Sequence, residues 1–111
     1  MYVFDIDAVR RALEAMDANW KEFMRVESLS TGLYRLKAGE RDAQKPHLED
    51  EIYFITKGRA TFAAGESIQE VAAGSIIYVE ARREHRFVDI VEDLEALVIF
   101  APAEGSVPPP G

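Results

Sequence analysis

Apolar residues follow a helical spacing near the start of the chain and gather in short runs after it. Residues 7–17 place apolar side chains on one face at the spacing of an α-helix, and Asp5 or Asp7 is available as an N-cap. The pattern predicts one short amphipathic helix over residues 7–17. No later segment between the turn signals is long enough for a second helix.

From Trp20 onward, aromatic and β-branched residues recur in short runs that are typical of strands. The expected strands are Phe23–Glu27, Gly32–Leu36, Glu51–Thr56, Ala60–Ala64, Ser67–Val71, Ile76–Val79, His85–Ile90 and Glu95–Phe100. Turn signals such as Lys57-Gly58 and Glu92-Asp93 separate them at short intervals. Many short strands without crossover helices predict an all-β fold, an antiparallel sandwich or barrel with one short N-terminal helix.

The length of 111 residues indicates one domain, which we expect to span residues 1–103. The segment from Ala101 contains Pro102 and three consecutive prolines at positions 108–110, so we expect it to lie outside the core. Residues 104–111 are expected to form a flexible, Pro-rich tail.

Composition narrows the classes of function. The 13 basic and 20 acidic residues give a net charge of −7, which argues against nucleic acid and anionic membranes as partners. The absence of cysteine excludes disulfides, thiolate metal sites and cysteine nucleophiles. The first residues lack the basic start and apolar run of a signal peptide, and no segment approaches a membrane span of about 20 residues, so we expect a cytoplasmic protein.

Both histidines, His47 and His85, lie beside acidic residues near the start of an expected strand. Along one straight strand, His47 and Glu51 would be about 13 Å apart, too far to share a metal about 2 Å from each. The polar residues 48–50 can make a turn that brings Glu51 back towards His47. If the strand that begins at His85 reaches the same end of the barrel, two imidazoles and one carboxylate converge.

Two histidines and one carboxylate are the ligand set that holds divalent iron, and with a fourth ligand this set also suits manganese, nickel, copper or zinc. Three protein ligands leave coordination positions open for a substrate or dioxygen. The alternative is structural: His47 as an exposed turn residue, His85 within a surface charge cluster, and Glu51 as a solvated carboxylate.

Two segments, Gly39–Gly58 and Gly74–Asp89, resemble the two sequence motifs of the cupin family. In the first motif, His47 and Glu51 stand in the family's places, with three residues between them and six between Glu51 and the closing glycine. Lys45 stands where the motif has its first histidine.

In the second motif, Gly74 and His85 match at the family's separation. Three positions depart from it, where Glu80, Arg82 and Asp89 replace Pro, Gly and Asn. The resemblance covers roughly residues 33–101. Within the family, the chain looks like the small single-domain cupins.

The resemblance implies a small antiparallel β-barrel of the jelly-roll type, with a divalent metal (Fe, Mn, Ni, Cu or Zn) inside it, and a homodimer. It also implies that His47, Glu51 and His85 are the metal ligands. A lysine ammonium cannot coordinate a metal unless it is deprotonated, so Lys45 removes one usual ligand. The nearest replacement is the amide oxygen of Gln44, and a water molecule or an outward-facing Lys45 are the alternatives.

The first hypothesis for function is a metal-dependent enzyme of the dioxygenase, isomerase or lyase type that acts on a small organic acid or enol. Glu49 or Tyr53 is a candidate for proton transfer, and Arg35 would select a carboxylate if it faced the cavity.

Two other hypotheses for function involve no catalysis. One is a barrel that binds a small ligand without an active metal centre, which the replacements at Lys45, Glu80 and Arg82 favour. The other is a structural module that dimerises through the apolar residues 2–4.

Overall fold

The computed structural model describes residues 1–109 and contains one helix and six strands. The elements are α1 (Ile6–Ala15), β1 (Trp20–Val26), β2 (Leu29–Leu36), β3 (Asp50–Ala64), β4 (Ser67–Ala72), β5 (Ile76–Val79) and β6 (His85–Ala101). All strand pairs are antiparallel, in the order β1-β2-β6-β3-β4, with β5 also paired to β3. The prediction of an all-β antiparallel barrel with one short N-terminal helix is confirmed.

The helix begins one residue earlier than predicted and ends at Ala15. Asp5 is its N-cap, and the Asp5 side chain accepts a hydrogen bond from the Asp7 backbone N–H at 3.1 Å. Among residues 1–109 no helix is long and apolar enough to cross a membrane.

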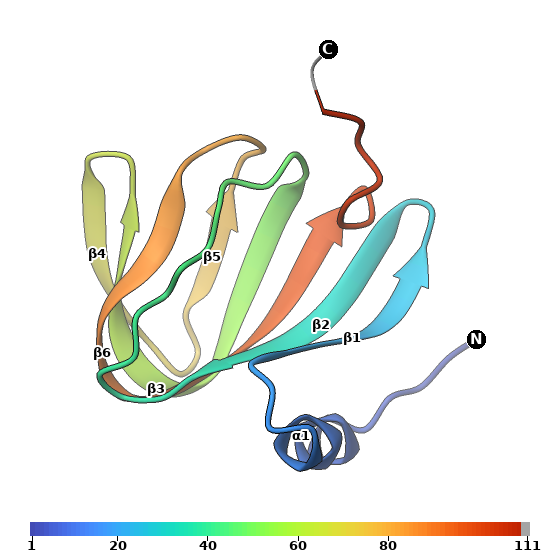
Figure 1. The fold of residues 1–111 in the computed structure, drawn as a ribbon, viewed down its shortest axis with the longest axis horizontal. Coiled ribbons are helices and arrows are strands. Elements are labelled where there is room, and N and C mark those ends of the chain that lie inside the picture. Colours follow the sequence, from blue (N-terminus) through green and yellow to red (C-terminus); the bar gives the residue numbers. More distant parts are fainter. Residues whose placement is uncertain (110–111) are drawn as a thin grey trace.

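The main difference from the predicted elements is that two pairs of expected strands are continuous. Lys57-Gly58 and Glu92-Asp93 do not end strands; they lie inside β3 and β6, which remain paired through this region with several shifts of register. These irregularities are β-bulges, which bend a strand and increase its twist without ending it. Figure 1 shows both long strands bending so that each runs through both walls of the barrel.

Gly58 makes the bend possible. Its φ angle is +91°, and a Cβ atom there would lie 2.2 Å from the Asp93 carbonyl oxygen and 2.9 Å from Leu94 Cα. Because β6 crosses so close to this position, only a residue without a side chain fits.

Alternation along β3 decides which side chains enter the barrel. Glu51, Tyr53 and Ile55 are buried, whereas Ile52 and Phe54 face outward. The interior is a single cluster of aliphatic and aromatic residues from five strands. Its buried members are Leu36, Tyr53, Ile55, Ala60, Phe62, Val71, Val79, Phe87, Ile90, Leu94, Ala96, Val98 and Phe100.

The helix covers the outer face of β2 and forms a second, smaller cluster, in which Val9 and Leu13 pack on Leu33. An ion pair fixes it: Arg10 Nε and Nη2 donate to the two carboxylate oxygens of Glu95 at 2.6 and 2.8 Å. Burial opposes ionisation of Glu95, but the hydrogen bonds from Arg10 and Thr56 outweigh it and lower the pKa of Glu95.

The first prediction concerns the crossing at Gly58. Gly58→Ala is expected to lower the free energy of unfolding by about 2–4 kcal/mol, because it combines backbone strain with a clash against β6. Gly74→Ala is the matched control, since Gly74 has a similar φ of +98° but no atom within 4 Å of its Cβ position. It should cost only about 1 kcal/mol. Urea denaturation measures both values, and equal losses would contradict a steric role for Gly58.

The second prediction concerns the pH dependence of the Arg10–Glu95 pair. A carboxylate whose pKa is lowered by folding stabilises the protein above its unfolded pKa of about 4.3, and this contribution is lost as the pH falls through the folded pKa. Arg10→Met should therefore destabilise the protein by about 1–3 kcal/mol at neutral pH, and the difference from wild type should shrink in acid. Arg11→Met, on the exposed side of the helix, should show neither effect. A difference that is constant with pH in urea denaturation would count against the pair.

Candidate metal centre

The first residue of the site, His47, lies in the segment 37–49, which has no regular secondary structure. Its carbonyl oxygen accepts a hydrogen bond from the Arg82 backbone N–H at 2.6 Å, which ties the segment to the turn before β6. The His47 side chain is partly exposed. Its imidazole packs edge-on against the ring of Phe100 at 4.7 Å between centroids.

The other two residues belong to the long strands. Glu51 is the second residue of β3 and points into the barrel, and His85 is the first residue of β6. His85 pairs with Ala64 at the other end of β3. The bend in β3 therefore brings the two ends of one strand together and places His85 opposite Glu51.

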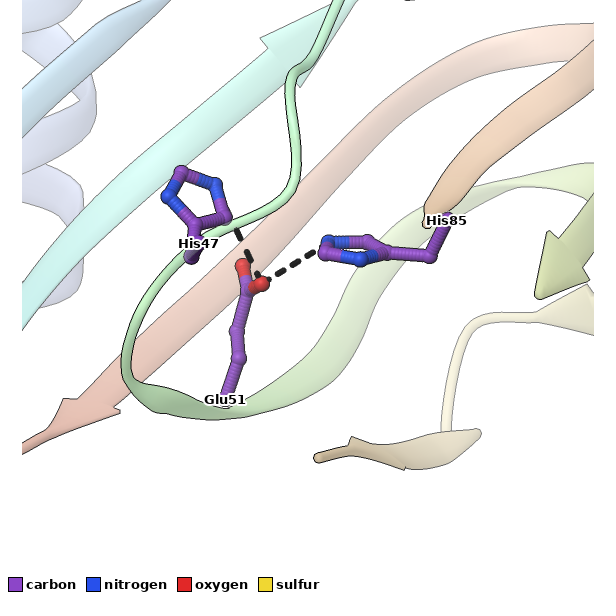
Figure 2. Close-up of side chains that lie close together, drawn as sticks. All are labelled: His47, Glu51 and His85. Atoms are coloured by element: carbon purple, nitrogen blue, oxygen red, sulfur yellow. Dashed lines mark ion pairs between the residues drawn. The ribbon is translucent and has the colours of Figure 1, made fainter. Parts of the chain in front are cut away.

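The three side chains meet inside the barrel, as Figure 2 shows. His85 Nε2 lies 2.9 Å from Glu51 Oε1, and His47 Nε2 lies 4.0 Å from the same oxygen. One potential ligand atom from each residue lies within 4.8 Å of the others, which is close enough to hold a metal ion. The expected convergence of two imidazoles and one carboxylate is thus observed, while their role as ligands stays a prediction.

A hydrogen bond to the backbone fixes the orientation of the His85 ring. Its Nδ1 lies 2.8 Å from the Arg83 carbonyl oxygen, and because a carbonyl only accepts, Nδ1 carries a hydrogen and Nε2 faces the site. Burial lowers the pKa of His85, but the Glu51 carboxylate and the Arg83 carbonyl outweigh it, so this pKa is raised above its ordinary value.

Glu51 provides the observation that bears most directly on metal binding. Its Oε1 atom is buried and accepts no well-aligned hydrogen bond among residues 1–109, although His85 Nε2 lies 2.9 Å away as an ion-pair partner. A buried carboxylate oxygen without a donor is costly, and a cation would compensate it. An oxygen and two imidazole nitrogens are a donor set suited to divalent iron and its neighbours.

Gln44 lies in the same cavity but is held by two neighbours. Its Nε2 donates to Asp42 Oδ2 at 2.7 Å, and its Oε1 accepts a hydrogen bond from the Tyr53 hydroxyl at 2.8 Å. The Tyr53 oxygen lies 3.1 Å from His85 Nε2, so Gln44 is linked to the site through Tyr53. Its role as a fourth ligand stays a prediction.

Two acidic residues at the site were missed by sequence reasoning. Asp42 is buried and accepts hydrogen bonds from the Tyr34 hydroxyl, Gln44 Nε2 and the Phe87 backbone N–H at 2.7–2.8 Å. An acidic residue in a polar segment with charged neighbours is usually solvated, so no signal in the sequence singles it out.

The second missed residue is Glu104, whose Oε2 lies 3.5 Å from His47 Nδ1. Its backbone N–H donates to Ser30 Oγ at 2.9 Å, and the preceding Ala103 is buried. The expectation that the segment from Ala101 lies outside the core is therefore wrong at Ala103, because the hydrogen bond to Ser30 ties the chain to the start of β2. Burial raises the pKa of Glu104, and His47 partly offsets this effect.

Other predicted candidates lie elsewhere. Arg35 does not face the cavity, since its Nε donates to the Ala18 carbonyl oxygen at 2.8 Å on the helix side of the sheet. Lys45 is exposed, in keeping with the outward orientation considered for it. Glu49 is buried but belongs neither to the group of three nor to the cavity lining.

Beside the three residues is a cavity of about 130 Å³. Its lining consists of Trp20, Tyr34, Gln44, His47, Glu51, Tyr53, Val98, Phe100 and Glu104. Trp20 is placed by Gly32, because a Cβ atom at Gly32 would lie 2.2 Å from the indole ring. Tyr53 is fully buried, and burial together with Glu51 raises the pKa of its phenol well above the ordinary value, so the hydroxyl stays neutral.

The barrel, the motif spacing and the convergence of His47, Glu51 and His85 together define a cupin. The Cupin domain family matches residues 32–101, more than half of the chain, and the protein belongs to this family. An uncharacterized protein of Streptomyces coelicolor is 43% identical over 104 residues, which cover 94% of this chain and 99% of that protein.

Solved structures share the fold. A protein of Bacillus halodurans superposes with a TM-score of 0.78 at 22% identity, covering 99% of this chain and 85% of the other. An RmlC-like cupin of Methanocaldococcus jannaschii, described as a double-stranded β-helix, superposes with a TM-score of 0.69 at 20% identity, covering 92% and 89% of the two chains. The likeness confirms the cupin fold.

Proposed function

We propose that this cupin binds a divalent metal ion through His47, Glu51 and His85, and that the metal centre is catalytic. The observation that carries the proposal is the buried Glu51 Oε1, which lacks a well-aligned donor and faces two imidazole nitrogens. Iron, manganese, nickel, copper and zinc all suit such a donor set.

The proposed activity is that of a dioxygenase, isomerase or lyase on a small organic acid or enol. When bound, a metal with open coordination positions would supply Lewis acidity or dioxygen activation. Of the two candidates for proton transfer, Tyr53 is favoured over Glu49, because Tyr53 lines the cavity and its hydroxyl oxygen lies 3.1 Å from His85 Nε2. A cytoplasmic location stays a prediction.

A second candidate is a barrel that binds a small ligand without an active metal centre. The observation that favours it is the exposed Lys45, which leaves three side chains in the group instead of the family's four. Measurement of the metal content by elemental analysis separates the two candidates.

The third prediction is that purified protein contains about one divalent metal per chain, and that His47→Ala, His85→Ala and Glu51→Gln each lower the metal affinity at least about tenfold. Elemental analysis by mass spectrometry of protein purified without a tag or chelator measures the content. Glu49→Gln is the matched control, because Glu49 is a buried carboxylate two residues from Glu51 but outside the group of three.

Wild-type protein that carries no metal and takes up none of the added divalent ions would overturn the metal-centre proposal and favour the non-catalytic binding function. Equal loss of metal in the Glu49→Gln control would contradict the assignment of Glu51. Circular dichroism of each variant separates lost metal from lost folding.

We further propose that the chain forms a homodimer through the outer face of the sheet. The register places Ile52 opposite Tyr78 and Phe54 opposite Ile76, so these four apolar side chains form one patch on the face away from the core. Ile76 and Tyr78 are 71% and 60% exposed, and they also line a groove of about 400 Å³ beside β4. Apolar patches of this kind on a soluble protein mark interfaces.

The fourth prediction is that the double variant Ile76→Glu and Tyr78→Glu is a monomer at concentrations where the wild type is a dimer, because two charges on each copy would be buried against each other. Sedimentation velocity over a concentration series measures this. Val91→Glu, at an exposed apolar residue outside the patch, should leave the dimer intact. A wild type that stays monomeric at high concentration would rule out the homodimer.

A further inference from the structure

Glu104 reaches the candidate metal centre from the segment that follows β6. The end of β6 pairs with the start of β2. The residues after β6 form a turn, in which Ala103 is buried and its carbonyl oxygen accepts a hydrogen bond from the Ser106 backbone N–H at 3.0 Å. This turn places Glu104 in the lining of the cavity, next to His47.

Two hydrogen bonds fix the backbone of Glu104. Its N–H donates to Ser30 Oγ at 2.9 Å, and its carbonyl oxygen accepts a hydrogen bond from Arg25 Nη2 at 2.7 Å. Arg25 is itself held by the carboxylate of Glu22, to which its Nε and Nη2 donate at 3.1 and 2.8 Å. Both anchors contact the main chain of Glu104, so neither occupies its carboxylate, and the side chain is presented to His47 from a fixed point.

The imidazole of His47 lies between two carboxylates. Its Nδ1 is 3.5 Å from Glu104 Oε2, and its Nε2 is 4.0 Å from Glu51 Oε1. A neutral imidazole carries one hydrogen, so the two carboxylates compete for it. The closer one, Glu104, favours the hydrogen on Nδ1, and this tautomer leaves the lone pair of Nε2 facing Glu51. The opposite tautomer places an N–H group towards Glu51, and that nitrogen cannot then bind a metal.

The two imidazoles of the site are thus oriented by different groups. His85 is held by the backbone carbonyl oxygen of Arg83. The side chain of Glu104 has the corresponding place behind His47, whose ring is partly exposed to water. An acceptor behind a metal-binding histidine fixes its tautomer and ring orientation, and a carboxylate in this place also makes the imidazole more basic.

We propose that Glu104 is a positioning residue of the metal centre: its carboxylate holds the hydrogen of His47 on Nδ1 and so leaves Nε2 available to the metal. This inference rests on the proposed metal centre, and it adds to that site a residue from outside the three candidate ligands. In this role Glu104 does not bind the metal and acts through His47 alone.

The fifth prediction concerns the tautomer of His47 in the metal-free protein. The chain has two histidines, so their ring nitrogens can be assigned by proton–nitrogen correlation NMR. At about pH 8.5, well above the ordinary histidine pKa of about 6.5, the wild type should carry the His47 hydrogen on Nδ1. Glu104→Ala should move most of this hydrogen to Nε2, towards Glu51. The His85 signals should not move, because the Arg83 carbonyl oxygen holds the hydrogen on its Nδ1.

Metal affinity, measured by competition with a chromophoric zinc chelator, gives a second readout. Glu104→Ala should lower the affinity for zinc about tenfold. This variant keeps both hydrogen bonds of the backbone at position 104, so the loss is not one of folding. Glu104→Gln keeps an oxygen that can accept the Nδ1 hydrogen, so it should regain most of the affinity. Glu49→Gln is the control for charge, since it removes a buried carboxylate two residues from His47 and outside the cavity lining, and its zinc affinity should stay close to that of the wild type.

Three results would overturn the inference: a His47 tautomer that is the same in Glu104→Ala and the wild type, no loss of zinc affinity in Glu104→Ala, or a loss in Glu104→Gln or Glu49→Gln as large as in Glu104→Ala. The last result would show an effect of charge alone. The proposed function fails separately, when the wild type takes up no zinc. The NMR measurement on the metal-free protein then still decides whether Glu104 sets the tautomer of His47.

Discussion

The bend shared by β3 and β6 is the constraint on which both the fold and the site depend. At Gly58 the backbone of β6 passes so close that no side chain fits, and both strands turn from one wall of the barrel into the other. His85, which pairs with one end of β3, thereby faces Glu51 at the other end. Straight strands would hold these groups tens of ångströms apart, at about 3.4 Å per residue.

Much of the fold and the central triad could be predicted from the sequence, because both rest on local patterns. Alternation with a period of two determines that Glu51 shares the inner face with Tyr53. Local patterns predict turns at the bend, since a glycine with polar neighbours gives the same signal in a hairpin and in a bulge. Only the pairing with β6, which comes from a distant part of the chain, distinguishes them.

The surroundings of the triad could not be predicted for the same reason. Asp42 and Glu104 act through contacts with residues far along the chain, such as Phe87 and Ser30. Arg35 lies between leucines of opposite parity, so alternation could not assign its face. Its orientation is fixed by the hydrogen bond to the Ala18 carbonyl oxygen, in the segment between α1 and β1. The contacts around the candidate ligands thus belong to the part of the site that local patterns do not determine.

Glu51 and Glu104 are the two carboxylates that line the cavity. A buried carboxylate is tolerated when a cation or donors compensate it, and Glu51 has one close imidazole, at His85, and a more distant one, at His47. A divalent ion bound there would outweigh the charge of Glu51 and leave the centre with a net positive charge. The imidazole of His47 lies between the two carboxylates, with Nε2 towards Glu51 and Nδ1 towards Glu104, so both carboxylates act on the same candidate ligand.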